Sequence, residues 1–155
     1  MSRKLAPLVL GAAALILVSV ALGGTGANTV RFNAVLTVDK NVPAAKRPAG
    51  AIGHFSATLT GSTLRWTITY AGLTGVATES HIHGGQTSPE RFQAVVVPLC
   101  GSYLNYGLPC RSGMTRTAKL DARSVALIKT GKTYVNVHTD KNPDGEIRGM
   151  IKVAP

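Results

Sequence analysis

Apolar and polar residues alternate along most of the chain beyond residue 28, which is the pattern of β-strands that bury one face. Between residues 30 and 38 every second position is apolar: Val30, Phe32, Ala34, Leu36 and Val38. Further short runs of this kind, rich in Thr and β-branched residues, are separated by turn-forming residues and occupy positions 51–59, 64–71, 79–83, 92–99, 115–120, 132–139 and 146–153. The pattern therefore predicts about eight strands and an all-β domain.

The spacing of these runs predicts an antiparallel β-sandwich or flattened Greek-key barrel of the immunoglobulin-like class. Turn-forming residues at 60–63 and 140–145 predict hairpins between the flanking strands. Asp121 is a good N-cap for residues 122–129, the single helical candidate. Nothing in the pattern indicates a second domain, so residues 28–155 are expected to form one.

The first 27 residues have the layout of a secretory signal peptide. A short basic stretch with Arg3 and Lys4 precedes an uncharged run over residues 5–23, and small residues follow up to Ala27. We expect cleavage after Ala27. The uncharged run is also long enough to remain as an uncleaved anchor. In both cases the domain lies outside the cytoplasm, either secreted or extracytoplasmic in the periplasm or at the cell surface, and meets a membrane only through this segment.

Cys100 and Cys110 are the two cysteines of the chain. In an exported protein a pair this close is most simply a disulfide, worth roughly 2–3 kcal/mol on the loop-entropy model. Metal binding by the two thiols is the alternative. It is less favoured because their separation is not a usual ligand spacing and no histidine lies nearby in the sequence.

The exported part is strongly basic. Two of the 17 Lys and Arg residues lie in the leader, which leaves 15 against seven Asp and Glu residues and a net charge of +8. Such a charge favours an anionic partner such as a cell-surface polymer, and it also keeps a protein soluble. Nucleic acid is not expected, because the basic residues are scattered and only 5% of residues are aromatic, too few for a stacking surface.

Three of the four histidines can converge on one sheet. His81 and His83 are two residues apart in a predicted strand, so their side chains point to the same face. His138 lies in another predicted strand, with Val135 and Val137 facing the other way. If the two strands are neighbours, the three imidazoles form a site suited to one copper or zinc ion.

A metal site of this kind needs neighbours that orient each imidazole ring. Glu79, Asn136 and Glu146 are the candidates for that role, and His54 or a water molecule is a candidate further ligand. The alternative is a structural cluster, in which the histidines hydrogen-bond one another, backbone carbonyls or Glu146 as a polar plug in the core. Arg148 is expected to form a cross-strand charge pair.

Little in the sequence supports an enzyme. There is no Gly-x-Ser-x-Gly nucleophile turn and no glycine-rich phosphate loop, and the acidic residues are dispersed. Cu/Zn superoxide dismutase, another Greek-key barrel, also carries His-x-His on a strand, but its two-metal site needs more histidines than the four present here. Weak dismutase-like activity of a single copper ion is the remaining enzymatic alternative. We therefore expect a non-catalytic binding module or, alternatively, a structural domain that interacts with an anionic polymer or an extracellular protein.

Several segments resemble the CHRD (chordin-type) domain family. They follow in the family's order and spacing over essentially all of residues 30–153. The most specific are His81-Ile-His-Gly-Gly85, Tyr134-Val-Asn-Val-His-Thr139 and Asn142-Pro-Asp-Gly-Glu-Ile-Arg-Gly149. The others are Phe32–Leu36, Val42-Pro43, Gly72-Leu73, Thr78–Ser80 and Val95–Leu99.

The resemblance implies an all-β, exported domain. In animals the domain occurs in chordin, an extracellular antagonist of bone morphogenetic proteins, and in bacteria it usually stands alone in an exported protein. The resemblance thus implies a fold and a compartment but no particular ligand. Ala44 stands where the family usually has a second proline, and His54 stands where a small polar residue is expected, so His54 is not carried over as a family position.

Overall fold

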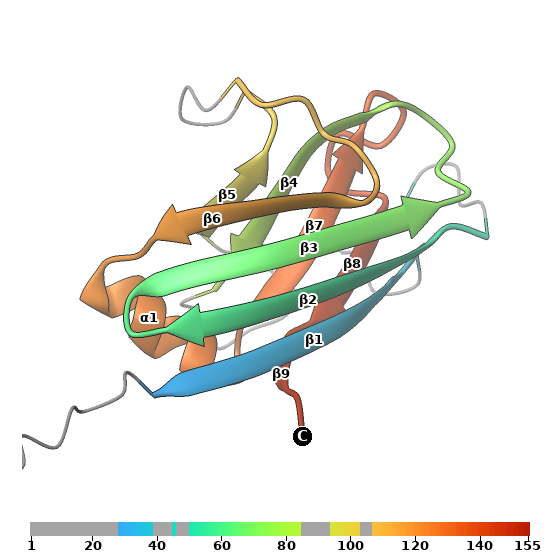
Figure 1. The fold of residues 1–155 in the computed structure, drawn as a ribbon. Coiled ribbons are helices and arrows are strands. Elements are labelled where there is room, and N and C mark those ends of the chain that lie inside the picture. Colours follow the sequence, from blue (N-terminus) through green and yellow to red (C-terminus); the bar gives the residue numbers. More distant parts are fainter. Residues whose placement is uncertain (1–27, 39–44, 46–49, 85–93, 103–106) are drawn as a thin grey trace, which may run out of the picture.

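A computed structural model of the chain describes residues 28–38, 45, 50–84, 94–102 and 107–155. Within these residues there are nine β-strands and one α-helix (Figure 1). Their bounds are β1 Thr29–Thr37, β2 Ile52–Thr60, β3 Thr63–Ala71, β4 Ala77–His83, β5 Val95–Cys100, β6 Met114–Lys119, α1 Ala122–Lys129, β7 Tyr134–Thr139, β8 Ile147–Met150 and β9 Lys152–Val153. Each predicted run corresponds to one strand, except that the last run is divided into β8 and β9.

The alternation of apolar residues decides which face of each strand is buried. In β1, Phe32, Ala34 and Leu36 are buried while the residues between them are exposed, as the sequence pattern predicts. Strands β2 and β3 alternate in the same way and pair along their full length. Gly61 turns the chain between them with a φ of 58°, a conformation that glycine adopts without strain.

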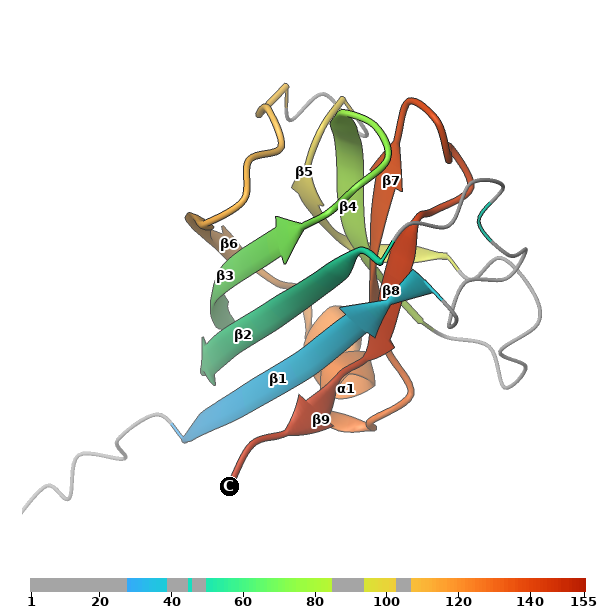
Figure 2. The same ribbon diagram turned by 90° about the vertical axis from the view of Figure 1, so that its right-hand side faces the viewer.

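The strands form one continuous sheet in the order β5–β4–β7–β8–β1–β2–β3–β6, in which every pairing is antiparallel, and β9 pairs with β1. The sheet curls on itself, so that β1, β2, β3 and β6 form one wall and β4, β5, β7 and β8 cross behind it (Figures 1 and 2). The result is a nearly closed barrel. The prediction of an all-β sandwich or flattened barrel with one short helix is confirmed.

The hydrophobic core fills the space between the two walls. Its largest buried side chains are Phe32, Leu36, Phe55, Leu59, Leu64, Trp66, Ile68, Ile82, Leu99, Ile128, Ile147 and Ile151. Helix α1 lies at one end of the barrel (Figure 2) and places Ile128 in this core. The helix begins where the sequence predicts, because the Asp121 carboxylate accepts a hydrogen bond from the Ser124 backbone N–H at 2.7 Å.

A disulfide joins the end of β5 to the following loop. Cys100 is bonded to Cys110, and their Cα atoms are 5.2 Å apart, which confirms the predicted bridge. Next to it the Gly101 N–H donates to the carbonyl of Leu108 at 2.7 Å. Gly101 has a φ of 97°, and a Cβ at this position would collide with Glu79. The disulfide loop therefore packs closely against β4.

The predicted signal peptide, residues 1–27, lies outside the described residues, and its cleavage after Ala27 stays a prediction, as does the single domain at 28–155. Positions 92 and 93 of the predicted fifth strand also lie outside them. Within the described part of the chain, no helix has both the length and the apolar character needed to cross a membrane.

Candidate metal centre

The three histidines come from two neighbouring strands, β4 and β7. The antiparallel register places Glu79 opposite His138, His81 opposite Asn136, and His83 opposite Tyr134. His81 and His83 share one face of β4, and His138 reaches the same face from β7, as predicted. The ligand nitrogens of the three imidazoles all lie within 4.8 Å of one another.

The cluster sits on the sheet face that points away from the hydrophobic core. Ile82 in β4 and Val135 and Val137 in β7 belong to the core, and side chains of adjacent residues in a strand point to opposite faces. The histidines are nevertheless buried, with 3%, 7% and 9% of their surface exposed for His81, His83 and His138. The alternative expectation of a polar plug within the core is therefore wrong about the location, because the strand alternation turns these rings outward.

His138 is held in one tautomer. Its Nδ1 lies 2.8 Å from the carbonyl oxygen of Pro143. A carbonyl oxygen only accepts hydrogen bonds, so Nδ1 carries the proton and Nε2 carries a lone pair. Nε2 lies 3.3 Å from Nδ1 of His81. This is the arrangement found when a histidine binds a metal through one nitrogen and is oriented through the other.

His81 lies between His138 and a carboxylate. Its Nε2 is 3.7 Å from a carboxylate oxygen of Glu79, and the other oxygen of Glu79 accepts a hydrogen bond from the Ser102 hydroxyl at 3.0 Å. Ser102 lies two residues after the disulfide-bonded Cys100. Glu79 thus lies beside His81 and is hydrogen-bonded to the disulfide loop, while its role in orienting a metal ligand stays a prediction.

A neutral His81 ring has one proton for these two contacts. If the proton is on Nδ1, the lone pair of Nε2 faces the carboxylate of Glu79, which is repulsive. If the proton is on Nε2, the lone pairs of His81 Nδ1 and His138 Nε2 face each other at 3.3 Å. The second arrangement is stable when a cation lies between the two nitrogens.

Protonation of both His81 nitrogens would also resolve the conflict, but the surroundings oppose it. Burial, followed by the neighbouring His138 and His83 rings, lowers the pKa of His81 to about 3. Burial also lowers the pKa of His138, although the hydrogen bond to Pro143 acts in the opposite direction. Both rings are therefore neutral near pH 7, which is the protonation state that binds metal ions.

His83 stacks on an aromatic ring beside the cluster. Its ring is nearly parallel to that of Tyr134, with centroids 5.0 Å apart, and meets the His81 ring edge-on at 5.4 Å. The Arg148 guanidinium from β8 lies 4.3 Å from the centre of the Tyr134 ring. Arg148 therefore makes a cation–π contact in place of the predicted charge pair, because its cross-strand neighbour Asn136 is neutral.

Asn136 lies directly opposite His81 and is 5% exposed. Its amide nitrogen is 3.5 Å from the carbonyl oxygen of Asp144. Its Oδ1 is buried and has no hydrogen-bond partner within the residues that the structure describes. A buried oxygen acceptor beside neutral imidazoles is costly unless it meets a donor or a cation; the role of Asn136 around a metal stays a prediction.

Residues 32–151 match the CHRD domain. The chain belongs to the CHRD domain family. The match covers both strands of the cluster, the disulfide and the β7–β8 hairpin, so all of the contacts described above lie within the CHRD domain. No curated protein and no solved structure matches the chain.

Glu146 does not orient the histidines in this CHRD domain. Its carboxylate accepts hydrogen bonds from the backbone N–H and hydroxyl of Thr74 at 2.6 and 2.8 Å. It also accepts from the Thr139 hydroxyl at 2.7 Å and the Asn142 amide at 3.0 Å. The prediction failed because Glu146 lies in the β7–β8 turn, before β8 begins, and its side chain joins two loops.

His54 lies in a different part of the CHRD domain. It is exposed on β2, opposite Val35 in β1 and Thr69 in β3. Strands β8 and β1 separate β2 from β7 in the sheet. His54 is therefore not part of the histidine group, and the expectation that it completes the site is wrong.

The arrangement in the CHRD domain suits a small cation held by nitrogen. An ion about 2.0–2.1 Å from each nitrogen keeps tetrahedral ligand atoms about 3.3–3.4 Å apart, which agrees with the 3.3 Å between His81 and His138. The same distance is longer than a usual buried N–H hydrogen bond.

Sequence reasoning missed the stack of His83, Tyr134 and Arg148 and the anchoring carbonyl of Pro143. The stack had a signal, because Tyr134 precedes His138 by four residues and thus shares its face of the strand. No sequence pattern predicts the contact of His138 with Pro143, because this contact depends on how the turn after β7 folds back on the strand.

Proposed function

We propose that this CHRD domain is a non-catalytic module, working outside the cytoplasm, that holds one copper or zinc ion on His81, His83 and His138. The observation that carries the proposal is the pair of facing nitrogens on His81 and His138, with Pro143 and Glu79 behind them. When the proton of His81 is on Nε2, facing Glu79, the lone pairs of His81 Nδ1 and His138 Nε2 are both available to one ion. Imidazole nitrogen is a preferred ligand of both metals.

The burial of the site supports a closed centre rather than a reactive one. All three rings are at most 9% exposed, and structural metal sites are closed whereas catalytic sites keep an open position. Asn136 Oδ1 is the candidate for a further oxygen contact. The disulfide between Cys100 and Cys110 supports an oxidising compartment, in agreement with the predicted export.

The first test is the metal content of the full chain, expressed through an export pathway without a histidine tag and supplied with copper or zinc. We expect roughly one ion per chain, with absorption spectroscopy showing nitrogen ligands at about 2.0–2.1 Å. The His81→Ala/His83→Ala variant should lose the ion. His54→Ala is the matched control and should keep it, because that residue lies outside the group.

Metal-free protein after this supply would refute the proposal, as would equal metal content in the wild type and the double variant. If the double variant does not fold, the metal content of His138→Gln is measured instead, since glutamine keeps a polar side chain at the same position. Retention of one nitrogen-bound ion by a folded His138→Gln variant would also contradict the three-histidine site.

A further inference from the structure

The outer face of the wall formed by β1, β2, β3 and β6 is a regular grid of polar side chains. Cross-strand pairs share a face, so the register defines rows that run across the strands. One row contains Arg31, Thr58, Arg65 and Thr117. The next contains Lys152 from β9, followed by Asn33, Ser56, Thr67 and Thr115. A third contains Thr29, Thr60, Thr63 and Lys119.

This polar face carries positive charge without negative charge. Arg31, Arg65, Lys119 and Lys152 are all exposed on it. The five strands concerned contain no Asp or Glu. The ion pairs seen among the described residues lie elsewhere, at Glu79 and at Asp140. Within the part of the chain that the structure describes, none of the four cations has an ion pair, and they therefore attract anions.

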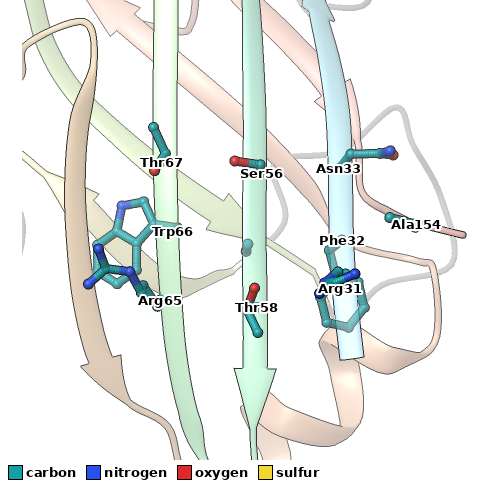
Figure 3. Close-up of a pocket in the computed structure, with 10 residues that line it drawn as sticks. Arg31, Phe32, Asn33, Ser56, Thr58, Arg65, Trp66, Thr67 and Ala154 are labelled. Carbon is teal, nitrogen blue, oxygen red and sulfur yellow. The ribbon is translucent and has the colours of Figure 1, made fainter. Parts of the chain in front are cut away.

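A shallow groove of about 310 Å³ lies between the two arginines (Figure 3). Arg31 rises from β1 and Arg65 from β3, with Thr58 and Ser56 on β2 between them. Strands about 4.8 Å apart place the two arginine backbones about 10 Å from each other. The volume is at the lower end of the range for ligand pockets, about 300–1,000 Å³, so the groove fits one anionic group and its immediate surroundings.

The groove offers many hydrogen-bond donors besides the two guanidinium groups. Ser56, Thr58 and Thr67 bring hydroxyls to it, and Asn33 brings an amide. Guanidinium binds sulfate and carboxylate through paired hydrogen bonds, while hydroxyls and amides suit the hydroxyls of a sugar. The rows continue past the groove to Lys119 and Lys152, so charges are repeated along a surface longer than one sugar ring.

The side chains exposed on this polar face favour a polysaccharide over other anionic partners. The large hydrophobic residues exposed on β1, β2, β3 and β6 are Val35 and Ile52, and no aromatic residue is among them. Single-stranded nucleic acid needs aromatic stacking platforms, and a membrane surface needs apolar or aromatic side chains that insert. A flat grid of cations, hydroxyls and amides lacks both.

We propose that this face binds an extended anionic polysaccharide, with a sulfate or carboxylate group held between Arg31 and Arg65. The site is separate from the histidine cluster, which lies on β4 and β7. Its binding therefore does not depend on metal.

The test measures binding of the full chain to heparin, polygalacturonate and neutral dextran at several salt concentrations. We expect salt-sensitive binding to one or both anionic polymers and none to dextran. Binding to polygalacturonate, which carries carboxylates alone, shows that a carboxylate is sufficient, whereas binding to heparin alone shows that sulfate is needed. Arg31→Gln/Arg65→Gln should weaken binding roughly tenfold or more at low salt, because two counter-charges are lost at one groove.

Arg111→Gln/Arg123→Gln is the matched control, since it removes the same charge from exposed positions outside this face. Thermal unfolding of both variants shows whether they fold like the wild type. Equal weakening by the two double variants would overturn the proposal, because net charge alone would explain the binding. So would absence of binding to both anionic polymers. Equally tight, groove-dependent binding to a duplex DNA or to phosphatidylserine vesicles would overturn the choice of polysaccharide.

Discussion

At the scale of single residues, Glu146 shows how a buried charge can hold loops together. It is fully buried and accepts four hydrogen bonds, from Thr74, Thr139 and Asn142. Burial by itself raises the pKa of Glu146, but these hydrogen bonds together outweigh it and hold the pKa below its usual value. The ionised carboxylate is thus part of the native fold, connecting the β3–β4 loop to the β7–β8 turn.

This shift makes stability depend on pH in a defined direction. A carboxylate whose pKa is lower in the folded state contributes fully above its unfolded pKa, about 4.5. The contribution is lost as pH falls through the lower, folded pKa. We expect Glu146→Gln to lower the free energy of unfolding at pH 7 by roughly 2–4 kcal/mol. Urea unfolding from pH 7 to pH 2 should show this difference shrinking below about pH 4.5.

Asp144→Asn is the matched control, because the same change is made in the same turn outside the Glu146 network. It should unfold nearly like the wild type at every pH. A difference between wild type and Glu146→Gln that stays constant down to pH 2 would contradict the role of the charge.

At the scale of elements, alternation in the sequence predicted the strands but not the loops that complete the site. The spacing of His81 and His83 was sufficient to place them on one face, and Val135 and Val137 correctly oriented β7. Their strands are neighbours, as expected. Of the partners of Glu146, Thr74 is 72 residues away in the β3–β4 loop and Asn142 lies in the β7–β8 turn, so no periodic pattern could reveal them.

The disulfide loop at the end of β5 packs against β4 and so bears on the geometry of the histidines. Cys100 and Cys110 anchor the loop in which Ser102 donates to Glu79, and Glu79 faces His81. We expect Cys100→Ser/Cys110→Ser to lower the free energy of unfolding by about 3 kcal/mol. It should also weaken metal binding about 10-fold or more, as loss of an orienting partner does. Chelator competition measures the second effect.

Ser102→Ala separates the two effects, because it removes the hydrogen bond and keeps the disulfide. It should weaken metal binding with little change in stability. Unchanged metal affinity in both variants would show that the loop does not position Glu79.

At the scale of the whole molecule, the proposed ion and the fold are thermodynamically coupled. A metal that binds the folded chain alone stabilises it by about 2.7 kcal/mol at 100 times its dissociation constant. We expect urea unfolding to shift by this amount on adding the bound metal. The shift should be retained in His54→Ala and abolished in His81→Ala/His83→Ala. An equal shift in the double variant would mean that the ion binds elsewhere.

Composition predicted the basic character of the whole molecule but not its arrangement. The net charge of +8 does not show where on the surface the positive charges gather, because that depends on which residues share a face of the sheet. Only the pairing of β1 with β2 and β9, and of β3 with β2 and β6, brings Arg31, Arg65, Lys119 and Lys152 to one wall. The alternation within each strand then turns them outward together.

The pairing of β4 with β7 also sets an order of events during synthesis. His81 and His138 are 57 residues apart in the chain, and β7 lies between β4 and β8 in the sheet. A growing chain therefore holds His81 and His83 long before their partner exists. Such distant pairings form late and slowly. The three rings meet only when the last strands dock, so under the proposed export and metal binding an unfolded chain would cross the membrane without an ion and take up metal at its destination.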